Sequence, residues 1–514
     1  MASVIRHRIS TSVVLLVVAA CASCSGTEPT SPSPDPFPRQ LSIVSGANVV
    51  DTVQVTLAAP LVIAVKTIDG SPRAGVSVRF DAVGSQDLSR VGERIISVAP
   101  SGSGSFTASD VETTDAQGRA SARIQFGTIS GAARIAITTA DGMTDTARFT
   151  VGAGVAVAMT VAIHDTTIGF TETFPLGAAL RDRLGNARAD QPSTTVAALI
   201  GAPVTLSSDG VVHAAASLGR SRVSVQGLGK SDSVFVNVVP AATIAATESD
   251  GLAVRIAQLS GKIIRRMLTI VLIFHDAARL PSWSPDGSRI AITAGGFNNG
   301  YSIQLLDTLA NAKLLAPASS RARYYGAQYT RNGQWLYFTD YDDATVPASN
   351  KVYRMHADGT GKEVVYFSSA ANGIWTNASP SATGDFVILS GIAFQGDASV
   401  PQVARLDVAQ QRLIPFVTSG TGAVYSPTAD RVAMVDASGR ILIAQPSGAG
   451  VQPLTTNTIS ATSFGPLSAP TWSPDGAYLL ARSASAGRYV VVRASDGVMV
   501  PTAVPSTLQD PSWR

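Results

Sequence analysis

The sequence predicts an all-β protein, with two β-sandwiches followed by a six-bladed β-propeller. Short runs of β-branched residues separated by Gly, Asp and Ser fill residues 41–240, and no long amphipathic pattern of helical period interrupts them. Residues 241–514 contain a repeated motif whose aromatic position advances from 283 to 513 in five steps, which average about 46 residues. A repeat of this length is typical of propeller blades. The composition, 45% hydrophobic and 15% charged, excludes disorder of the whole chain.

Residues 1–20 have the pattern of an export signal, with Arg6 and Arg8 followed by an apolar run up to Ala20. This run is too short to span a bilayer as a helix. The segment Val18-Ala19-Ala20-Cys21 resembles the lipobox of bacterial lipoproteins, which implies that Cys21 carries lipid and becomes the new N-terminus. Cys24 is the competing acceptor, and an ordinary signal peptide cleaved nearby is the alternative.

Residues 21–40 form a Pro/Ser-rich tether in this interpretation. Five prolines between 29 and 38 favour polyproline II, so that fifteen residues reach roughly 45 Å. Both cysteines of the sequence, Cys21 and Cys24, precede the tether's prolines. The predicted domains therefore contain no disulfide, Cys-ligated zinc or catalytic thiol.

Two sandwich domains are predicted at 41–152 and 153–240. The segments Ile68–Phe80 and Thr113–Thr139 resemble the bacterial Ig-like repeats of invasin and intimin-type proteins. The segment Val204–Gly227 is similar to the second group of bacterial Ig-like domains. Both resemblances imply spacer modules without a catalytic role.

The propeller is predicted at 241–514. Its clearest repeats are PSWSPDGSRIAIT (Pro281–Thr293) and PTWSPDGAYLLAR (Pro470–Arg482), in which a Trp ends one strand and a Pro-Asp-Gly turn leads to the next. We assign structural roles to the aromatic and turn residues of the repeat, namely Trp283, Asp286, Gly287, Trp472, Asp475, Gly476 and Trp513.

The ends of the repeat region predict how the ring closes. The last motif includes a single strand, whereas 252–258 and 262–268 supply two strands before the first motif, so we expect one composite blade. The Trp-Ser-Pro-Asp-Gly signature resembles the six-bladed propeller of TolB-type envelope proteins. The N-terminal α/β domain of that family is absent, which puts a role in the Tol system in doubt. The apolar run Leu268–Phe274 is expected to be an outer strand or a buried link.

No catalytic residue, metal site or cofactor is predicted. The sequence lacks a G-x-S-x-G nucleophile motif, and the propeller region contains only two histidines, His275 and His356. The formal charge of +3 comes without a cluster of Lys and Arg, so we expect no nucleic-acid partner.

The longer loops share one rim of the predicted propeller, and function often concentrates in such loops. We expect a possible binding rim formed by Tyr324, Tyr325, Asp340, Asp342, Asp343 and Trp375. The alternative is that the aromatic residues pack between blades and that the acidic residues lie in a solvated loop.

Together these features predict an exported, lipid-anchored protein of the bacterial envelope, in the outer membrane, whose propeller binds an envelope protein or a cell-wall or surface glycan. Ala22, rather than Asp, after Cys21 is compatible with delivery to the outer membrane. We expect a monomer. The alternatives are a polysaccharide-acting enzyme or sensor, and a surface adhesin.

Overall fold

The computed structural model describes residues 39–84, 93–268, 277–296, 300–317, 323–342, 349–369, 374–395, 398–417, 420–454 and 464–514. The predicted signal peptide, the lipidation candidate Cys21 and nearly all of the tether lie outside these ranges. The chain divides into two compact units, one ending at Gly152 and the other spanning Ala153–Arg514. Each unit is described by itself.

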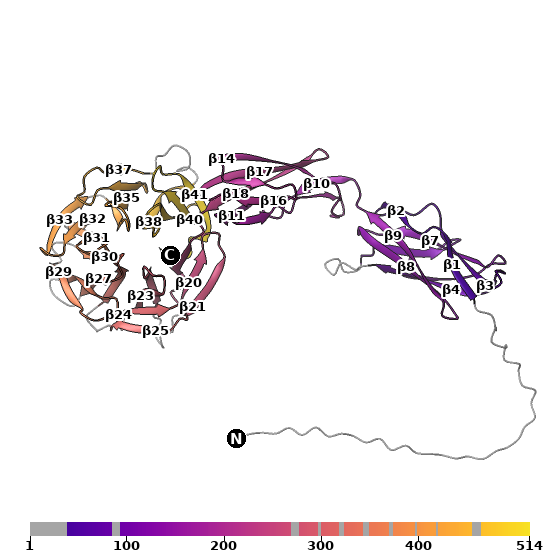
Figure 1. Cartoon of the computed structure of the whole chain (residues 1–514), viewed down its shortest axis with the longest axis horizontal. Coiled ribbons are helices and arrows are strands. Elements are labelled where there is room, and N and C mark those ends of the chain that lie inside the picture. Colours follow the sequence, from indigo (N-terminus) through magenta and orange to yellow (C-terminus); the bar gives the residue numbers. More distant parts are fainter. Residues whose placement is uncertain are drawn as a thin grey trace, which may run out of the picture. The chain divides into compact units, whose positions relative to one another are not determined.

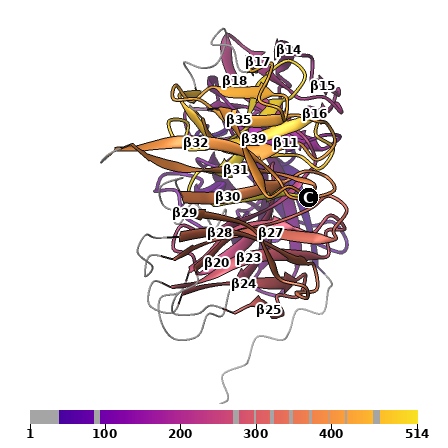
Figure 2. The same ribbon diagram turned by 90° about the vertical axis from the view of Figure 1, so that its left-hand side faces the viewer.

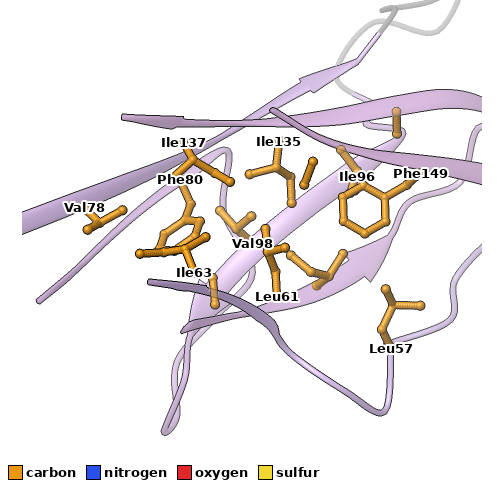
Figure 3. Close-up of a cluster of buried hydrophobic side chains, with 14 of the residues drawn as sticks. Leu57, Leu61, Ile63, Val78, Phe80, Ile96, Val98, Ile135, Ile137 and Phe149 are labelled. Atoms are coloured by element: carbon orange, nitrogen blue, oxygen red, sulfur yellow. The ribbon is translucent and has the colours of Figure 1, made fainter. Parts of the chain in front are cut away.

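The first unit contains two sheets that face each other across a hydrophobic core (Figure 3). One sheet has the order β1 (Arg39–Ser45), β3 (Leu61–Thr67), β7 (Arg119–Phe126), β5 (Ile96–Pro100). The other has the order β2 (Val49–Thr52), β9 (Thr144–Gly152), β8 (Gly131–Thr139), β4 (Ser77–Gly84), β6 (Ser109–Thr113).

Strict alternation in the sequence explains this core. In β7, Ala120, Ala122, Ile124 and Phe126 are buried while the residues between them are not, because successive side chains of a strand point to opposite faces. Ile135 and the other inward residues of β8 meet them from the opposite sheet. The sandwich expected at 41–152 is therefore present as a two-sheet domain.

The second unit begins with another sandwich, built around its own core cluster. Its main sheet has the order β11 (Asp165–Gly169), β18 (Lys230–Val239), β17 (Gly219–Gly227), β14 (Ser193–Ile200). Two smaller sheets complete it, with the orders β12 (Thr173–Pro175), β16 (Val211–Ala214), β15 (Val204–Leu206), and β10 (Ala156–Thr160), β13 (Ala179–Asp182).

Six four-stranded blades follow, counted over the described residues and arranged around a ring (Figure 1). From the innermost strand outward, blade 1 is β22 (Ala277–Trp283), β23 (Arg289–Gly296), β24 (Gly300–Asp307), β25 (Ala312–Ala316), and blade 2 is β26 (Arg323–Tyr329), β27 (Trp335–Asp342), β28 (Ser349–His356), β29 (Glu363–Ser369). Blade 3 is β30 (Ile374–Pro380), β31 (Phe386–Gln395), β32 (Ala398–Asp407), β33 (Arg412–Val417), and blade 4 is β34 (Thr421–Tyr425), β35 (Val432–Val435), β36 (Ile441–Ala444), β37 (Gln452–Pro453). Blade 5 is β38 (Leu467–Trp472), β39 (Tyr478–Ser483), β40 (Arg488–Arg493), β41 (Met499–Pro505), and blade 6 is β42 (Gln509–Trp513), β19 (Thr243–Thr247), β20 (Ala253–Gln258), β21 (Ile263–Leu268). Figure 2 shows the blades from the side, where the long β31–β32 hairpin projects furthest.

Blade 6 closes the ring. Its innermost strand, β42, comes from the C-terminal end of the sequence and pairs antiparallel with β19, with Ile244 opposite Trp513 and Ala245 opposite Ser512. The composite blade expected from the sequence is therefore present, although it contains three earlier strands rather than two, because the short, alanine-rich β19 was not predicted. Of the apolar run Leu268–Phe274, only Leu268 lies within the described residues, at the end of β21.

The second sandwich packs directly against the propeller. Leu218 and Val239 of the sandwich share one buried cluster with Tyr489, Val500 and other residues of blades 5 and 6. At its edge the rings of Phe170 and Tyr478 meet at 6.3 Å between centroids. This sandwich therefore extends the propeller's core.

A carboxylate bound by two guanidinium groups supports blade 6. Glu248 is buried and accepts hydrogen bonds from Arg266 at 2.7 and 2.6 Å and from Arg255. The Arg266 contact, opposed by burial and reinforced by Arg255, lowers the pKa of Glu248 from 4.5 to about 2. The ionised carboxylate therefore favours the folded state.

We predict that Glu248→Gln lowers the free energy of unfolding by about 2 kcal/mol at pH 7. This value is smaller than the pKa shift alone implies, because both arginines reach solvent. Because the folded pKa lies below the ordinary value, this stabilisation is present above pH 4.5 and disappears as the pH falls towards 2. Urea unfolding at several pH values measures the difference. Glu363→Gln, at an exposed ion pair with Arg354, is the control and should change stability by less than about 0.5 kcal/mol. A Glu248→Gln effect that does not vary with pH would contradict this assignment.

Candidate functional site: the central cavity of the propeller

The innermost strands of five of the six blades share a positive-φ bulge three residues before the repeat's aromatic position. In blades 1, 5 and 6 the bulge residues are Leu280, Ala469 and Asp510, each followed by Pro, and each has a positive φ between 49° and 51°. A side chain in this conformation costs about 1 kcal/mol or more, and bulges of this kind redirect a strand. In blades 2 and 4 the equivalent positions are Gly326 and Gly422, where positive φ is readily adopted. The bulges direct the strands toward the centre of the ring.

In blades 1, 5 and 6 a tryptophan follows the bulge and hydrogen-bonds to the neighbouring blade. The indole Nε1 of Trp472 donates to the carbonyl of Val424 in blade 4, and that of Trp513 donates to the carbonyl of Thr471 in blade 5, both at 3.2 Å. Trp283 is equally buried, and its backbone N–H donates to Ser512 Oγ of blade 6 at 3.1 Å.

The Pro-Asp-Gly turns form on one side of the ring. Asp286 accepts hydrogen bonds from Ser284 Oγ at 2.5 Å and from the backbone N–H of Ser288 at 3.0 Å, and these lower its pKa to about 2. Asp475 accepts equivalent hydrogen bonds from Ser473 Oγ and the N–H of Ala477. Both turns also contain a glycine with positive φ, Gly287 in blade 1 and Gly476 in blade 5. In the structure, these motif residues form turns.

The innermost strands of all six blades surround a central cavity of about 980 Å³. Its wall is rich in aromatic and proline side chains. Tryptophan contributes from blades 1, 3, 5 and 6, and tyrosine from blades 2 and 4. These aromatic residues are Trp283, Tyr325, Tyr329, Trp375, Tyr425, Trp472 and Trp513.

Two amide side chains form a polar strip on the wall between blades 2 and 3. Gln328 Nε2 donates to Asn377 Oδ1 at 2.8 Å, and both residues line the cavity. This bond leaves Gln328 Oε1 as an acceptor and Asn377 Nδ2 as a donor for other groups. Next to the strip, Tyr325 lies with its ring 5.0 Å from that of Tyr301. The wall therefore combines flat apolar surfaces with paired hydrogen-bonding groups.

Charged side chains lie at two levels of the cavity wall. Arg279 precedes the bulge residue of blade 1, and the half-buried Asp510 is the bulge residue of blade 6. Burial raises the pKa of the Asp510 carboxyl. On the side of the Pro-Asp-Gly turns, Arg331 extends from blade 2 to blade 5 and donates to the carbonyl of Pro474. There the Arg514 guanidinium lies over the Trp283 ring at 5.3 Å. Arg331 and Arg514 thus narrow this end of the cavity.

Three members of the binding rim expected from the sequence are buried in the structure. Tyr324 and Trp375 are not exposed loop aromatics, because both lie in innermost strands and are buried. Tyr324 packs edge-on against Phe338 and accepts a hydrogen bond from Lys362 Nζ at 2.9 Å. Asp340 is also buried and accepts from the Tyr353 hydroxyl at 3.0 Å.

The other three members have different positions. Tyr325 faces the cavity, which it lines together with the buried Trp375. Asp342 ends β27, and Asp343 lies outside the described residues. The structure therefore does not gather the six residues into one rim.

Several cavity residues were missed in the sequence. Asp510 lies at the bulge position, Gln328 directly before the repeat aromatic of its blade, and Asn377 three residues before the aligned Pro380. These offsets are constant within the repeat, so a position-by-position alignment of the blades would have indicated which side chains face the centre.

The described residues contain neither a metal-binding group nor a membrane-spanning helix. In the described ranges, no group of three or more His, Cys, Asp or Glu is placed to hold a metal ion. Likewise, none of the helical segments among the described residues has the length and apolar character needed to cross a membrane.

Fold and site together define the class: a six-bladed β-propeller with a ligand-sized central cavity, fused to a β-sandwich. No protein-family model matches the sequence, and no curated protein does.

Solved structures with some likeness include TolB from Acinetobacter baumannii, at 14% identity over 69% of this chain and 99% of that one, with a TM-score of 0.41. A nidogen/laminin complex matches at 11% identity over 53% and 98%, with a TM-score of 0.40. An oligogalacturonate lyase in complex with manganese matches at 11% identity over 65% and 74%, with a TM-score of 0.34. At these scores the fold assignment rests on the strand pairing and not on the likenesses.

Proposed function

We propose that this chain is an exported envelope protein, anchored by lipid on Cys21, whose propeller binds a ligand in its central cavity. The observation that carries the proposal is the cavity itself, because its volume of about 980 Å³ and the seven aromatic residues in its wall suit a binding site. The first sandwich acts as a spacer in this proposal, and the second supports the propeller through their shared core.

The chemistry of the wall indicates what the ligand offers. Flat aromatic faces bind proline, aromatic or sugar rings, and the Gln328–Asn377 pair presents one free acceptor beside one free donor. Peptide groups and neighbouring sugar hydroxyls both supply the complementary pair. The ligand is therefore a segment of an envelope protein or a stretch of glycan.

The aromatic wall supplies its own reporter. All five tryptophans of the sequence belong to the propeller, and four of them line the cavity. We predict that a peptide or glycan fraction of the envelope changes the tryptophan emission of the purified protein. Gln328→Leu with Asn377→Leu should weaken this response about tenfold or more, because two hydrogen bonds to the ligand are lost.

Gln410→Ala, at an exposed position on blade 3, is the matched control and should bind as the parent does. If the emission change shows that the cavity variant binds with the same affinity as the parent, the ligand binds elsewhere. Shortening of the glycan over time would instead favour the polysaccharide-acting enzyme.

The anchor is tested separately in cells of a bacterium that processes lipoproteins. We predict that Cys21→Ser abolishes labelling by a fatty acid and releases the protein from the membrane fraction, whereas Cys24→Ser has no effect. The reverse result would move the anchor to Cys24. Digestion of the protein by protease added to intact cells would support the adhesin alternative.

A further inference from the structure

Strand β14 is an open sheet edge that is exposed on both faces. It pairs only with β17, so its other edge has no neighbour among the described residues (Figure 1). Six of its eight residues are exposed, among them Val196 at 38% and Leu199 at 52%. The strand, STTVAALI, contains no charged residue. Proteins usually protect such an edge with charges, because its free N–H and C=O groups can pair with another strand.

The propeller of the same chain shows the contrast. Among its outer strands of five or more described residues, four carry a charged side chain: Arg265 and Arg266 in β21, Lys313 in β25, Glu363 in β29 and Arg412 in β33. The fifth, β41, has none, and it is the strand covered by β11, β17 and β18 of the second sandwich. Most of its residues are buried accordingly. In this propeller the uncharged outer edge is thus the covered one, whereas β14 is uncharged and uncovered.

We propose that β14 is covered by β14 of a second copy of this chain, in an antiparallel pair that joins the two sandwich sheets. Two copies of one strand carry the same net charge, so a charged strand would repel its copy when the two pair. The neutral β14 avoids this repulsion. The register of β14 shifts between Ala198 and Ile200, which leaves Ser193–Ala198 as six regular residues for the ladder.

This inference departs from the monomer expected from the sequence and is independent of the cavity. A two-fold pair of this kind is self-complementary and needs no other component. It also leaves the propeller's cavity, which is formed by other strands, open to its ligand.

Sedimentation velocity of the purified chain, with Cys21→Ser and Cys24→Ser to prevent acylation, tests the proposal. Between about 1 and 100 µM we expect the mass to rise from one chain to two. Val196→Lys with Ala197→Lys should leave a single chain throughout this range, because both substitutions add charge to exposed positions of the edge. The matched control adds the same charge at exposed positions of the first unit, Val50→Lys with Val111→Lys, and should dimerise as the parent does.

Hydrogen exchange provides a second measurement that does not depend on a variant's folding. In the parent, the outward-facing amides of β14 should exchange several-fold more slowly at 100 µM than at 1 µM, while those of the charged edge β6 should not change. A parent that remains a single chain at 100 µM would overturn the proposal, as would a dimer that persists in the Val196→Lys, Ala197→Lys variant. Protection of β14 only on addition of another protein would also overturn it, by assigning the edge to a different partner.

Discussion

Replacing Trp513 with Ala is expected to lower the free energy of unfolding of the propeller by about 4 kcal/mol. The side chain is 4% exposed, belongs to the core shared by blades 5 and 6, and donates to the carbonyl of Thr471. Its strand, β42, is also the one that closes the ring against β19. The substitution therefore removes a large apolar group and a hydrogen bond between blades at the closure. Urea unfolding followed by circular dichroism measures the loss.

Trp335→Ala is the comparison for this effect. Trp335 is only half-buried, stacked on His356 at 4.1 Å beneath the Arg354 guanidinium, and it does not line the cavity. We expect a loss of about 1 to 2 kcal/mol from it. Equal losses of unfolding free energy from the two variants would show that the closing strand contributes no more to stability than the site of Trp335 does.

Replacing Leu218 in the second sandwich with Ala is expected to destabilise the propeller by about 3 kcal/mol, although the residue belongs to neither the ring nor its blades. Leu218 is 2% exposed and packs in the cluster that contains Val491 and Val500 of blade 5. Sandwich and propeller should therefore unfold in one transition. Because all tryptophans lie in the propeller, their emission during urea unfolding reports the effect directly.

Ile135→Ala, in the core of the first unit, is the counterpart. It should lower the stability of that unit and leave the tryptophan transition unchanged, because the first unit has its own core. If Leu218→Ala leaves the tryptophan unfolding transition unchanged and shifts only another unfolding signal, the prediction of a single transition is wrong.

The sequence predicted the propeller because its determinants are local. The Pro-Asp-Gly turn and the preceding Trp recur at a constant interval, and each repeat folds into the same unit, so the number of blades and the composite closure follow from counting. Strand β19 was missed because Ile244 is flanked mainly by Ala and Thr, and one of its two partner strands, β42, lies more than 250 positions away.

The cavity could not be predicted in the same way, because strand alternation fails at a bulge. Leu280 and Asp510 adopt a positive φ that no sequence rule assigns to Leu or Asp before Pro, and this shift decides which neighbouring side chains face the centre. Tyr324 and Trp375 stand next to loops in the sequence, which is why the pattern predicts an exposed position for them. In the structure each continues a strand, and burial of an aromatic side chain is favoured there.

The pairing of β42 with β19 also sets the order of events during folding. The Thr247 hydroxyl donates to the carbonyl of Gln509, 262 residues later, only once the closing strand is in place. Contacts of such sequence separation form slowly because the chain entropy is lost before they are made. Until then β19 has an open strand edge and β42 has no partner strand. During this interval the chain is most prone to aggregate or to be cleaved.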